Sequence, residues 1–196
     1  MKAMTDARAK LKSRAGTSLA EMLFCVFLLL LVSAGMTAGI ALAAGQYRDQ
    51  RELSNAKLLY STLSDAVTAE LRYTGTVVVA DPNADTTPLL EFYSRSYSRQ
   101  DGLSAFAAVD DDGYSTTYGY LMLGDRSTGV SSVFDGLALI SRASYADGLL
   151  AGINVVCHPA AESFTVTLTV VSSAGDTLVS GNFDVDAANH LTISSS

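Results

Sequence analysis

A single run of weakly polar and apolar residues, from Met22 to Gly45, constrains this chain more than any other feature of its sequence. Within the run, the 22 residues from Leu23 to Ala44 would form a helix of about 33 Å at ~1.5 Å per residue. That length is enough to cross the ~30 Å hydrocarbon layer of a bilayer. We therefore expect one membrane-spanning helix.

Charge is distributed unevenly around this run. Residues 1–16 carry five basic side chains and one acidic side chain, a local charge of +4. Since the whole chain has a formal net charge of −7, the remaining residues carry −11. The positive-inside rule predicts a cytoplasmic N-terminus and an extracytoplasmic remainder. A body this acidic disfavours direct binding of nucleic acid, because clustered Lys and Arg side chains hold the phosphates in such complexes.

Two interpretations of the N-terminus treat it only as a targeting or anchoring device. In the first, the run is the core of a secretory signal peptide, with a small-x-small cleavage site at Ala41-Leu42-Ala43. In the second, the run is a plain membrane anchor, and Ser18 and Glu21 form the S-x-x-E capping box that begins a helix. The run is longer than the apolar core of a signal peptide, which favours an anchor.

A third interpretation treats residues 14–23 as one unit. Arg14 ends the basic leader, Gly16 follows, and Glu21 stands five residues after Gly16, immediately before the apolar run. This arrangement resembles the N-terminus of type IV pilins and of the pseudopilins of type II secretion and competence systems. The resemblance implies that a prepilin peptidase cuts between Gly16 and Thr17 and that Thr17 becomes the methylated N-terminal residue. Thr17 stands where the family most often has Phe.

The resemblance gives each part of this segment a physical role. Cleavage after Gly16 would remove all five leader cations, and with them the charge that opposes extraction of the helix from the membrane. A carboxylate at the rim of an apolar helix is costly unless a cation neutralises it. The freed α-amine of Thr17 on a neighbouring subunit would supply that cation, so Glu21 would set the axial register between packed helices. Gly35 and Gly39, one turn apart, would let helices approach closely.

The helix is expected to continue beyond the membrane. Residues 46–72 contain no Pro and no Gly, and apolar side chains recur at steps of three and four, as on one face of a helix. These side chains are Leu53, Ala56, Tyr60, Leu63, Val67 and Leu71. Joined to the membrane segment, they predict one helix of 54 residues from Leu19 to Arg72, about 80 Å long.

After Gly75 the sequence changes to short runs rich in β-branched and aromatic residues, separated by turn residues. In the clearest run, Phe164–Val170, apolar and hydroxyl side chains alternate, and with Thr177–Val185 it predicts an antiparallel hairpin. Further strands are expected at 76–80, 89–94, 118–123, 137–140 and 153–157. Residues 97–117 are expected to form a long loop with Ala-rich helical potential at Leu103–Val109. The polar end of the chain around His190 is expected to be a frayed tail.

These elements predict an α+β fold in which a long N-terminal helix, transmembrane and then amphipathic, packs on an antiparallel β-sheet head. This is the pilin-like architecture that the resemblance implies. The expected organisation is a basic prepilin leader at 1–16, a transmembrane or filament-core helix at 17–45, an amphipathic continuation at 46–72 and an extracytoplasmic head at 73–196.

The head contains no enzyme motif that we recognise. The sequence lacks a G-x-S-x-G elbow, a Walker loop and an H-E-x-x-H, and neither His158 nor His190 has a nucleophile at a recognisable spacing. The acidic segments 81–85 and 110–113 do not match a calcium loop, and Cys157 beside His158 lacks a second pair of zinc ligands. We expect no enzymatic activity, no cofactor and no metal site. On the predicted topology Cys25 and Cys157 cannot meet within one chain, so no intrachain disulfide is expected.

The sequence thus favours a structural subunit, a minor pilin or pseudopilin, of a type IV pilus-like or type II secretion-like filament. The resemblance implies four kinds of partner: a prepilin peptidase, other pilin or pseudopilin subunits, an assembly platform protein with its ATPase, and the membrane. The expected location is that of a single-pass membrane protein which reaches the cell surface on assembly. The alternative is an anchored or secreted extracytoplasmic binding domain whose N-terminus is only a targeting signal.

Overall fold

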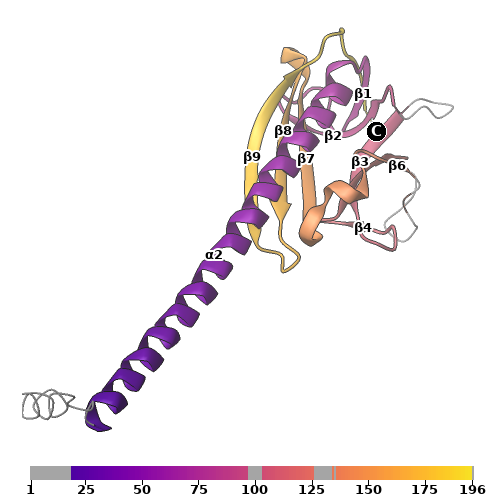
Figure 1. The fold of residues 1–196 in the computed structure, drawn as a ribbon. Helices are drawn as coiled ribbons and strands as arrows, with labels where there is room; N and C mark the ends of the chain where they lie inside the picture. The colour runs from indigo at the N-terminus through magenta and orange to yellow at the C-terminus, as the bar shows by residue number, and fades with distance from the viewer. Residues whose placement is uncertain (1–18, 97–102, 126–133, 135, 196) are drawn as a thin grey trace, which may run out of the picture. The chain divides into compact units, whose positions relative to one another are not determined.

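The computed structural model describes residues 19–96, 103–125, 134 and 136–195. The chain divides into two compact units, Met1–Gln50 and Arg51–Ser196. The long helix α2 (Leu19–Arg72) contributes its N-terminal part to the first unit and its C-terminal part to the second (Figure 1). The prediction of a single helix of 54 residues is confirmed.

In the second unit, α2 turns one apolar face toward the core. The buried apolar residues of this face are Ala56, Leu59, Leu63, Val67 and Leu71. The predicted stripe is therefore confirmed at Ala56 and from Leu63 onwards, whereas Leu53 remains 37% exposed and Tyr60 is half-buried. The buried part of the helix begins at Ala56, three residues after Leu53.

The described residues of the second unit form ten strands in one sheet. The strands are β1 (Thr76–Val79), β2 (Thr87–Tyr93), β3 (Leu103–Val109), β4 (Ser115–Thr116), β5 (Tyr120–Gly124), β6 (Gly136–Ala138), β7 (Leu150–His158), β8 (Ser163–Val171), β9 (Thr177–Asp186) and β10 (Thr192–Ser195). The main path of the sheet runs β6-β5-β3-β2-β7-β8-β9. Off this path, β1 lies between β2 and β10, and β4 pairs with β3. Short 3-10 turns occur at η1 (Arg142–Ser144), η2 (Ala146–Gly148) and η3 (Pro159–Ala161).

Strands β7, β8 and β9 form an antiparallel meander behind α2 (Figure 1). Along β8, four apolar side chains are buried and the three threonines between them point to the opposite face: Phe164, Val166, Leu168 and Val170 against Thr165, Thr167 and Thr169. The buried set shares its core with Leu63 and Val67 of α2. The predicted hairpin is confirmed, since β8 and β9 pair along their whole length.

The expectation of a loop with helical potential at Leu103–Val109 is wrong. These residues form β3, which pairs with β5 at successive positions that end with Val109 opposite Tyr120. Alanine favours a helix over most residues by only a few tenths of a kcal/mol. Pairing with β5 places Ala108 and Val109 in the buried core, so tertiary contacts override the local preference of the alanines.

The expectation of a frayed end is also wrong. Thr192–Ser195 forms β10, which pairs in parallel with β1 and places Thr192 opposite Thr76. Leu191, immediately before β10, is buried in the core. The strand pairs within the described residues are otherwise antiparallel, and the α+β fold class is confirmed.

Candidate functional site

The predicted site residues fall at the N-terminal end of the chain. Gly16 and Thr17, the two residues of the predicted cleavage site, lie outside the described residues. Glu21 lies in the first turn of α2, where the partial positive charge of a helix N-terminus favours a carboxylate. Gly35 and Gly39 lie further along the same helix. The structure thus describes the part of the site from Leu19 onward.

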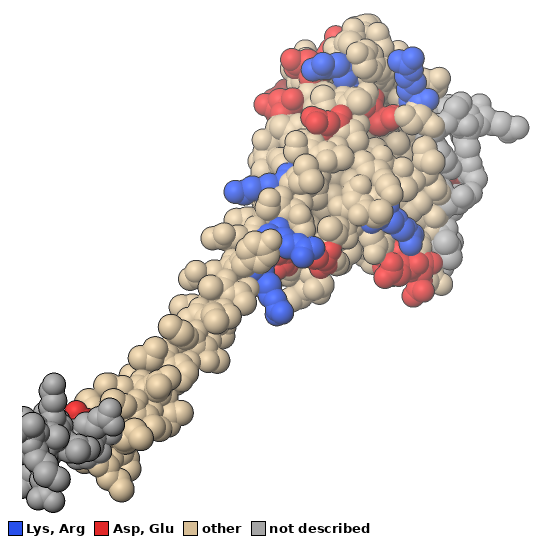
Figure 2. All heavy atoms as spheres, in the orientation of Figure 1, with Lys and Arg blue, Asp and Glu red and all other residues tan. Residues whose placement is uncertain are grey.

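An uncharged helical surface follows Glu21 and extends over residues 22–47. Its large apolar side chains are 44% to 71% exposed and include Met22, Leu23, Phe24, Val26, Phe27, Leu28, Leu29, Leu30, Leu31, Val32, Met36, Ile40, Leu42 and Tyr47. Figure 2 shows this length of α2 as an unbroken tan surface. The helix is long and apolar enough to cross a membrane, and none of its apolar window is buried within the chain. A helix that is apolar on all sides is stable only where lipid or other helices cover it.

Two hydroxyl side chains within this surface are satisfied by the helix itself. Ser33 Oγ donates to the backbone oxygen of Leu29 at 2.6 Å, and Thr37 Oγ1 donates to the backbone oxygen of Ser33 at 2.9 Å. Such bonds to the preceding turn provide a partner without water. These two hydroxyl side chains are therefore compatible with a hydrocarbon environment.

Gly35 and Gly39 leave bare backbone on this surface. A Cβ atom added at either position would meet no atom within 4 Å, apart from the backbone of the helix itself. Packing within the chain therefore gives no reason for glycine at these positions. Close approach of another helix does give one, because small residues let two helix backbones come near each other.

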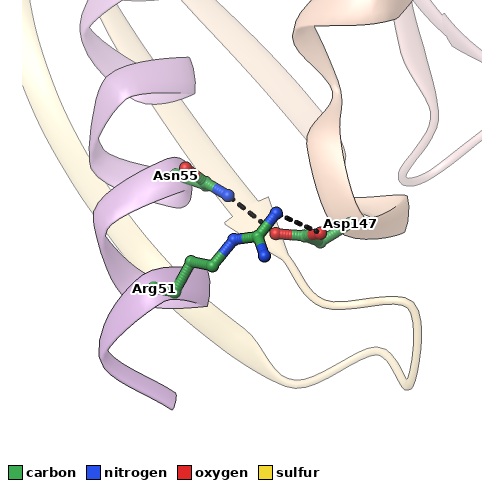
Figure 3. Close-up of polar contacts among 3 residues, drawn as sticks. All are labelled: Arg51, Asn55 and Asp147. Carbon is green, nitrogen blue, oxygen red and sulfur yellow. Dashed lines mark hydrogen bonds and ion pairs between the residues drawn. The ribbon is translucent and has the colours of Figure 1, made fainter. Parts of the chain in front are cut away.

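A polar contact joins α2 to the head near the start of the second unit (Figure 3). Asn55 Nδ2 donates to Oδ2 of Asp147 at 2.7 Å, and Arg51 Nη2 lies 3.6 Å from Oδ1 of the same carboxylate. Asp147 has a φ of 58°, in the left-handed region. Sequence reasoning missed this residue. The Asp147-Gly148 pair is a turn signal, but nothing in the sequence pairs the turn with α2.

A second missed residue is the buried carboxylate of Glu70, which is 8% exposed. Ser94 Oγ donates to Oε2 of Glu70 at 2.8 Å, and Ser96 Oγ donates to Oε1. A buried charge is tolerated when hydrogen bonds of this kind satisfy it. The helical period places Glu70 one turn after the buried Val67, but the two serines come from beyond β2 and could not be assigned from spacing.

No family model, curated protein or solved structure matches this chain. The structure supports one part of the pilin resemblance, which is the architecture. A long N-terminal apolar helix packs its later part on an antiparallel sheet. The cleavage motif, the assembly partners and the orientation in a membrane stay predictions.

The histidines of the head take part in polar contacts on its surface. His158 Nε2 lies 2.9 Å from Thr165 Oγ1, and Thr165 Oγ1 donates to Oδ1 of Asp184 at 2.7 Å. Because the hydroxyl proton is directed at Asp184, the Nε2 atom of His158 is the donor to Thr165. The Nδ1 atom of His190 contacts the carboxylate of Glu162. These contacts crosslink neighbouring strands and turns.

The acidic loops use carboxylates to hold their own turns. Asp81 Oδ1 accepts from the backbone N–H of Asn83 at 3.0 Å, and Asp110 Oδ1 accepts from the backbone N–H of Tyr114 at 2.8 Å. These are the local bonds that Asp forms in turns. Within the described ranges, no group of three or more His, Cys, Asp or Glu side chains is placed to hold a metal ion.

Both cysteines are free thiols, and only Cys25 is exposed. Cys157 is buried in the core of the sheet, and burial raises the pKa of its thiol to about 11. A buried thiol that stays protonated is a weak nucleophile and a weak metal ligand. Cys157 therefore acts as a small apolar core residue.

Proposed function

We propose that this chain is a structural subunit, a minor pilin or pseudopilin, of a type IV pilus-like or type II secretion-like filament. It is made as a membrane-inserted precursor, trimmed after Gly16 and assembled through α2. The observation that carries the proposal is the two-part surface of α2, which follows directly on the motif from Gly16 to Glu21.

The two parts of α2 need different surroundings. In the part that belongs to the second unit, apolar side chains occupy one face, and the sheet of the same chain buries them. In residues 22–47, large apolar side chains occupy every face, and the described residues leave them uncovered. Lipid satisfies such a surface in a precursor, and the helices of neighbouring subunits satisfy it in a filament. One helical surface thus serves both states.

Removal of the leader is the step that separates these two states. Near an anionic cytoplasmic leaflet each basic residue contributes about 1 kcal/mol of attraction. Residues 1–16 hold five basic residues, and all of them precede the predicted cut. Cleavage after Gly16 therefore removes a tether of several kcal/mol and allows the helix to leave the bilayer for the filament.

Glu21 determines how far one helix is displaced along the next. A carboxylate in apolar surroundings costs about 3 kcal/mol when nothing neutralises it. In the filament, the α-amine of Thr17 on a neighbouring subunit supplies the neutralising charge. Only one axial offset brings the two groups together, so this pairing selects a single register among the many that an apolar helix surface permits.

The proposal implies a defined set of partners and an orientation. The basic leader remains in the cytoplasm, where a prepilin peptidase removes it, and the head lies outside. A platform protein and its ATPase move the trimmed chain out of the membrane, and other pilin or pseudopilin subunits receive it. The head carries no catalytic role in this assembly.

N-terminal sequencing of the chain, purified from membranes of cells that contain a prepilin peptidase, tests the proposal. Filament assembly requires Thr17 at the N-terminus, and mass spectrometry of the same material reports its methylation. The matched control is the chain from cells without the peptidase, which keeps residues 1–16. An N-terminus at Ala44 would instead support a secreted domain. A leader retained in both strains would support a plain anchor and overturn the proposal.

A further inference from the structure

A hollow lies on the face of the sheet that α2 does not cover. It has a volume of about 160 Å³ and lies between the segment before β5 and strands β7 and β8. Its lining includes Thr117, Tyr118, Gly152, Asn154, Thr167 and Thr169. The two threonines of β8 alternate with side chains that are buried in the core under α2, so the hollow opens on the opposite face. We call it the outer groove.

One wall of the outer groove depends on a close approach of Tyr118 to Gly152. A Cβ atom at Gly152 would lie 2.7 Å from the backbone oxygen of Thr117 and 2.8 Å from a ring carbon of Tyr118. Glycine therefore provides the space in which this segment rests on β7. Gly119 and Ala151 exchange two backbone hydrogen bonds of 2.9 Å, which hold the segment in place. The ring of Tyr118 stays 40% exposed and offers its surface to the groove.

The floor of the outer groove offers hydrogen-bonding groups. Asn154 and Thr167 stand opposite each other on β7 and β8. Within the described residues, no protein group forms a hydrogen bond with the amide of Asn154 or the hydroxyl of Thr167. Thr169 adds a hydroxyl, which lies 3.0 Å from Ser180 Oγ. An amide and two hydroxyls together supply both donors and acceptors to a ligand.

The outer groove has an uncharged lining, which favours a neutral ligand. The residues that line it include no Asp, Glu, Lys or Arg. Asp184 of β9 stands opposite Thr165 of β8, and its carboxylate accepts a hydrogen bond of 2.7 Å from the hydroxyl of Thr165. A phosphorylated or nucleotide ligand would find no cation here, and such ligands depend on Arg, Lys or helix N-termini.

The strand pairing around the outer groove argues against an extended peptide as the ligand. A peptide that adds to a sheet needs a continuous run of open backbone groups along one edge. On this side of β7, Gly119 already pairs with Ala151, and Thr87 pairs with Cys157. Because backbone groups in an antiparallel strand alternate in direction, only Ile153 and Val155 face this side between the two paired positions. That opening is too short for a strand.

We propose that the outer groove binds a neutral carbohydrate, with one hexopyranose ring stacked on Tyr118 and its hydroxyl groups bonded to Asn154 and Thr167. A pyranose has an apolar C–H face, which the electron-rich face of an aromatic ring attracts. Its rim of hydroxyl groups needs the mixed donors and acceptors that the floor provides. At about 160 Å³ the outer groove is smaller than a typical ligand site, which limits the ligand within it to a single sugar ring. The proposal stands apart from filament assembly, because these residues all belong to the head.

The test uses the full-length chain in phosphocholine micelles, which contain no sugar, with 13C-labelled threonine methyl groups observed by NMR. The probes are lactose, maltotriose and triacetylchitotriose. At least one of them should shift the Thr167 and Thr169 methyl signals in a saturable manner. Tyr118→Ala should weaken the binding about tenfold, because it removes the stacking surface. Asn154→Ala should weaken it several-fold, because it removes one set of hydrogen bonds.

Two control variants and two competing ligands make the result decisive. Tyr114→Ala removes another exposed tyrosine, 44% exposed and outside the outer groove, and should leave the affinity unchanged. Tyr118→Phe keeps the ring and should retain binding, which guards against a Tyr118→Ala chain that fails to fold. Glucose 6-phosphate and a peptide with the sequence of β9 serve as competing ligand classes. The proposal is wrong if none of the sugars causes saturable shifts, if Tyr118→Ala and Asn154→Ala bind as the native chain does, or if only the phosphate or the peptide binds.

Discussion

The side-chain amide of Asn55 donates a 2.7 Å hydrogen bond to the carboxylate of Asp147 and so joins α2 to the turn before β7. Arg51, one helical turn before Asn55, lies 3.6 Å from the same carboxylate. Residues four apart lie on one face of a helix, so a single acidic group contacts two successive turns of α2. Asp147 thereby links the start of the packed part of α2 to the turn before β7.

Loss of this carboxylate should lower the stability of the head. Asp147→Ala removes the hydrogen bond from Asn55 and the contact with Arg51, and alanine is also strained at a φ of 58°. We expect the free energy of unfolding to fall by about 1–2 kcal/mol, measured by urea unfolding with circular dichroism. Asp147→Gly relieves the strain without restoring the bond, so its loss should be smaller. Asp147→Asn keeps a bonding side chain that tolerates this φ and should be close to native. Equal stability of the alanine and native chains would contradict this account.

A second contact between α2 and the sheet depends on the absence of a side chain at Gly181. A Cβ atom at this position of β9 would lie 2.7 Å from the hydroxyl oxygen of Tyr60 and 3.3 Å from its ring carbon. Gly181→Ala should therefore lower the free energy of unfolding by about 1 kcal/mol. Tyr60→Phe removes the hydroxyl, so the double variant should lose less than Gly181→Ala alone. A double-mutant cycle measures this coupling, and strictly additive effects would show that the contact is absent.

Alkaline pH should weaken the fold through Cys157. Burial raises the pKa of this thiol from 9.0 to about 11, so between these values the unfolded chain loses a proton that the folded chain keeps. The free energy of unfolding should fall by about 2 kcal/mol from pH 9 to pH 11. Burial also raises the pKa of Tyr145 to about 12, which adds a similar decrease only above pH 10.

Cysteine variants separate these contributions. Cys157→Ala should remove the pH dependence between pH 9 and pH 10, whereas Cys25→Ala should leave it unchanged, since Cys25 is exposed. The slope of stability against pH is the quantity to compare, because Cys157→Ala also changes core packing. If the slope of Cys157→Ala matches that of the native chain, the thiol is not its source.

The features that follow a local period were predictable from the sequence. The helical stripe of α2 and the alternation along β8 depend on neighbours within a few residues, and both are confirmed. The pairing of β10 with β1 joins Thr192 to Thr76, across more than one hundred residues, and no local signal specifies such a partner. The strand at Leu103–Val109 was missed for a related reason: the alanines favour a helix, and pairing with β5 decides the outcome.

The polar residues of the head were less predictable than its apolar ones. Asp147 and Glu70 both contact groups that lie far away in sequence: Asp147 reaches Asn55, and Glu70 reaches Ser94. The outer groove depends in the same way on Tyr118 resting on Gly152. The N-terminal motif is different, because the roles that we propose for Gly16 and Glu21 depend only on their spacing. Such a motif is readable in the sequence even though Gly16 and Thr17 lie outside the described residues.

Filament assembly should depend on the charge of Glu21. Glu21→Gln keeps the shape of the side chain and removes the charge that we propose to pair with the α-amine of Thr17. We expect normal membrane insertion but at least a tenfold loss of chain from the sheared filament fraction, because an unpaired amine at the helix end costs a few kcal/mol. Glu52→Gln on the same helix is the matched control and should assemble normally. Immunoblots of membrane and filament fractions measure both, and normal incorporation of Glu21→Gln would remove the register role.

Larger side chains at Gly35 and Gly39 should block filament assembly and leave the fold of the individual chain unchanged. Neither position has any atom outside the helix backbone within 4 Å of an added Cβ, so Gly35→Leu and Gly39→Leu meet no clash within the chain. Replacing glycine also raises helix propensity, by about 1 kcal/mol per site. The precursor should therefore insert and be cleaved as before.

Any loss of assembly in these leucine variants must then arise between chains. Leucine at either position holds two helix backbones apart, and close backbone approach is what small residues provide at such interfaces. Gly45→Leu is the control, because residue 45 lies about 100° around the helix from the Gly35–Gly39 pair, and an added Cβ there likewise meets nothing within 4 Å. The sheared filament fraction should fall for Gly35→Leu and Gly39→Leu and stay at the native level for Gly45→Leu. Equal assembly of all three would place the helix contact on another face of α2.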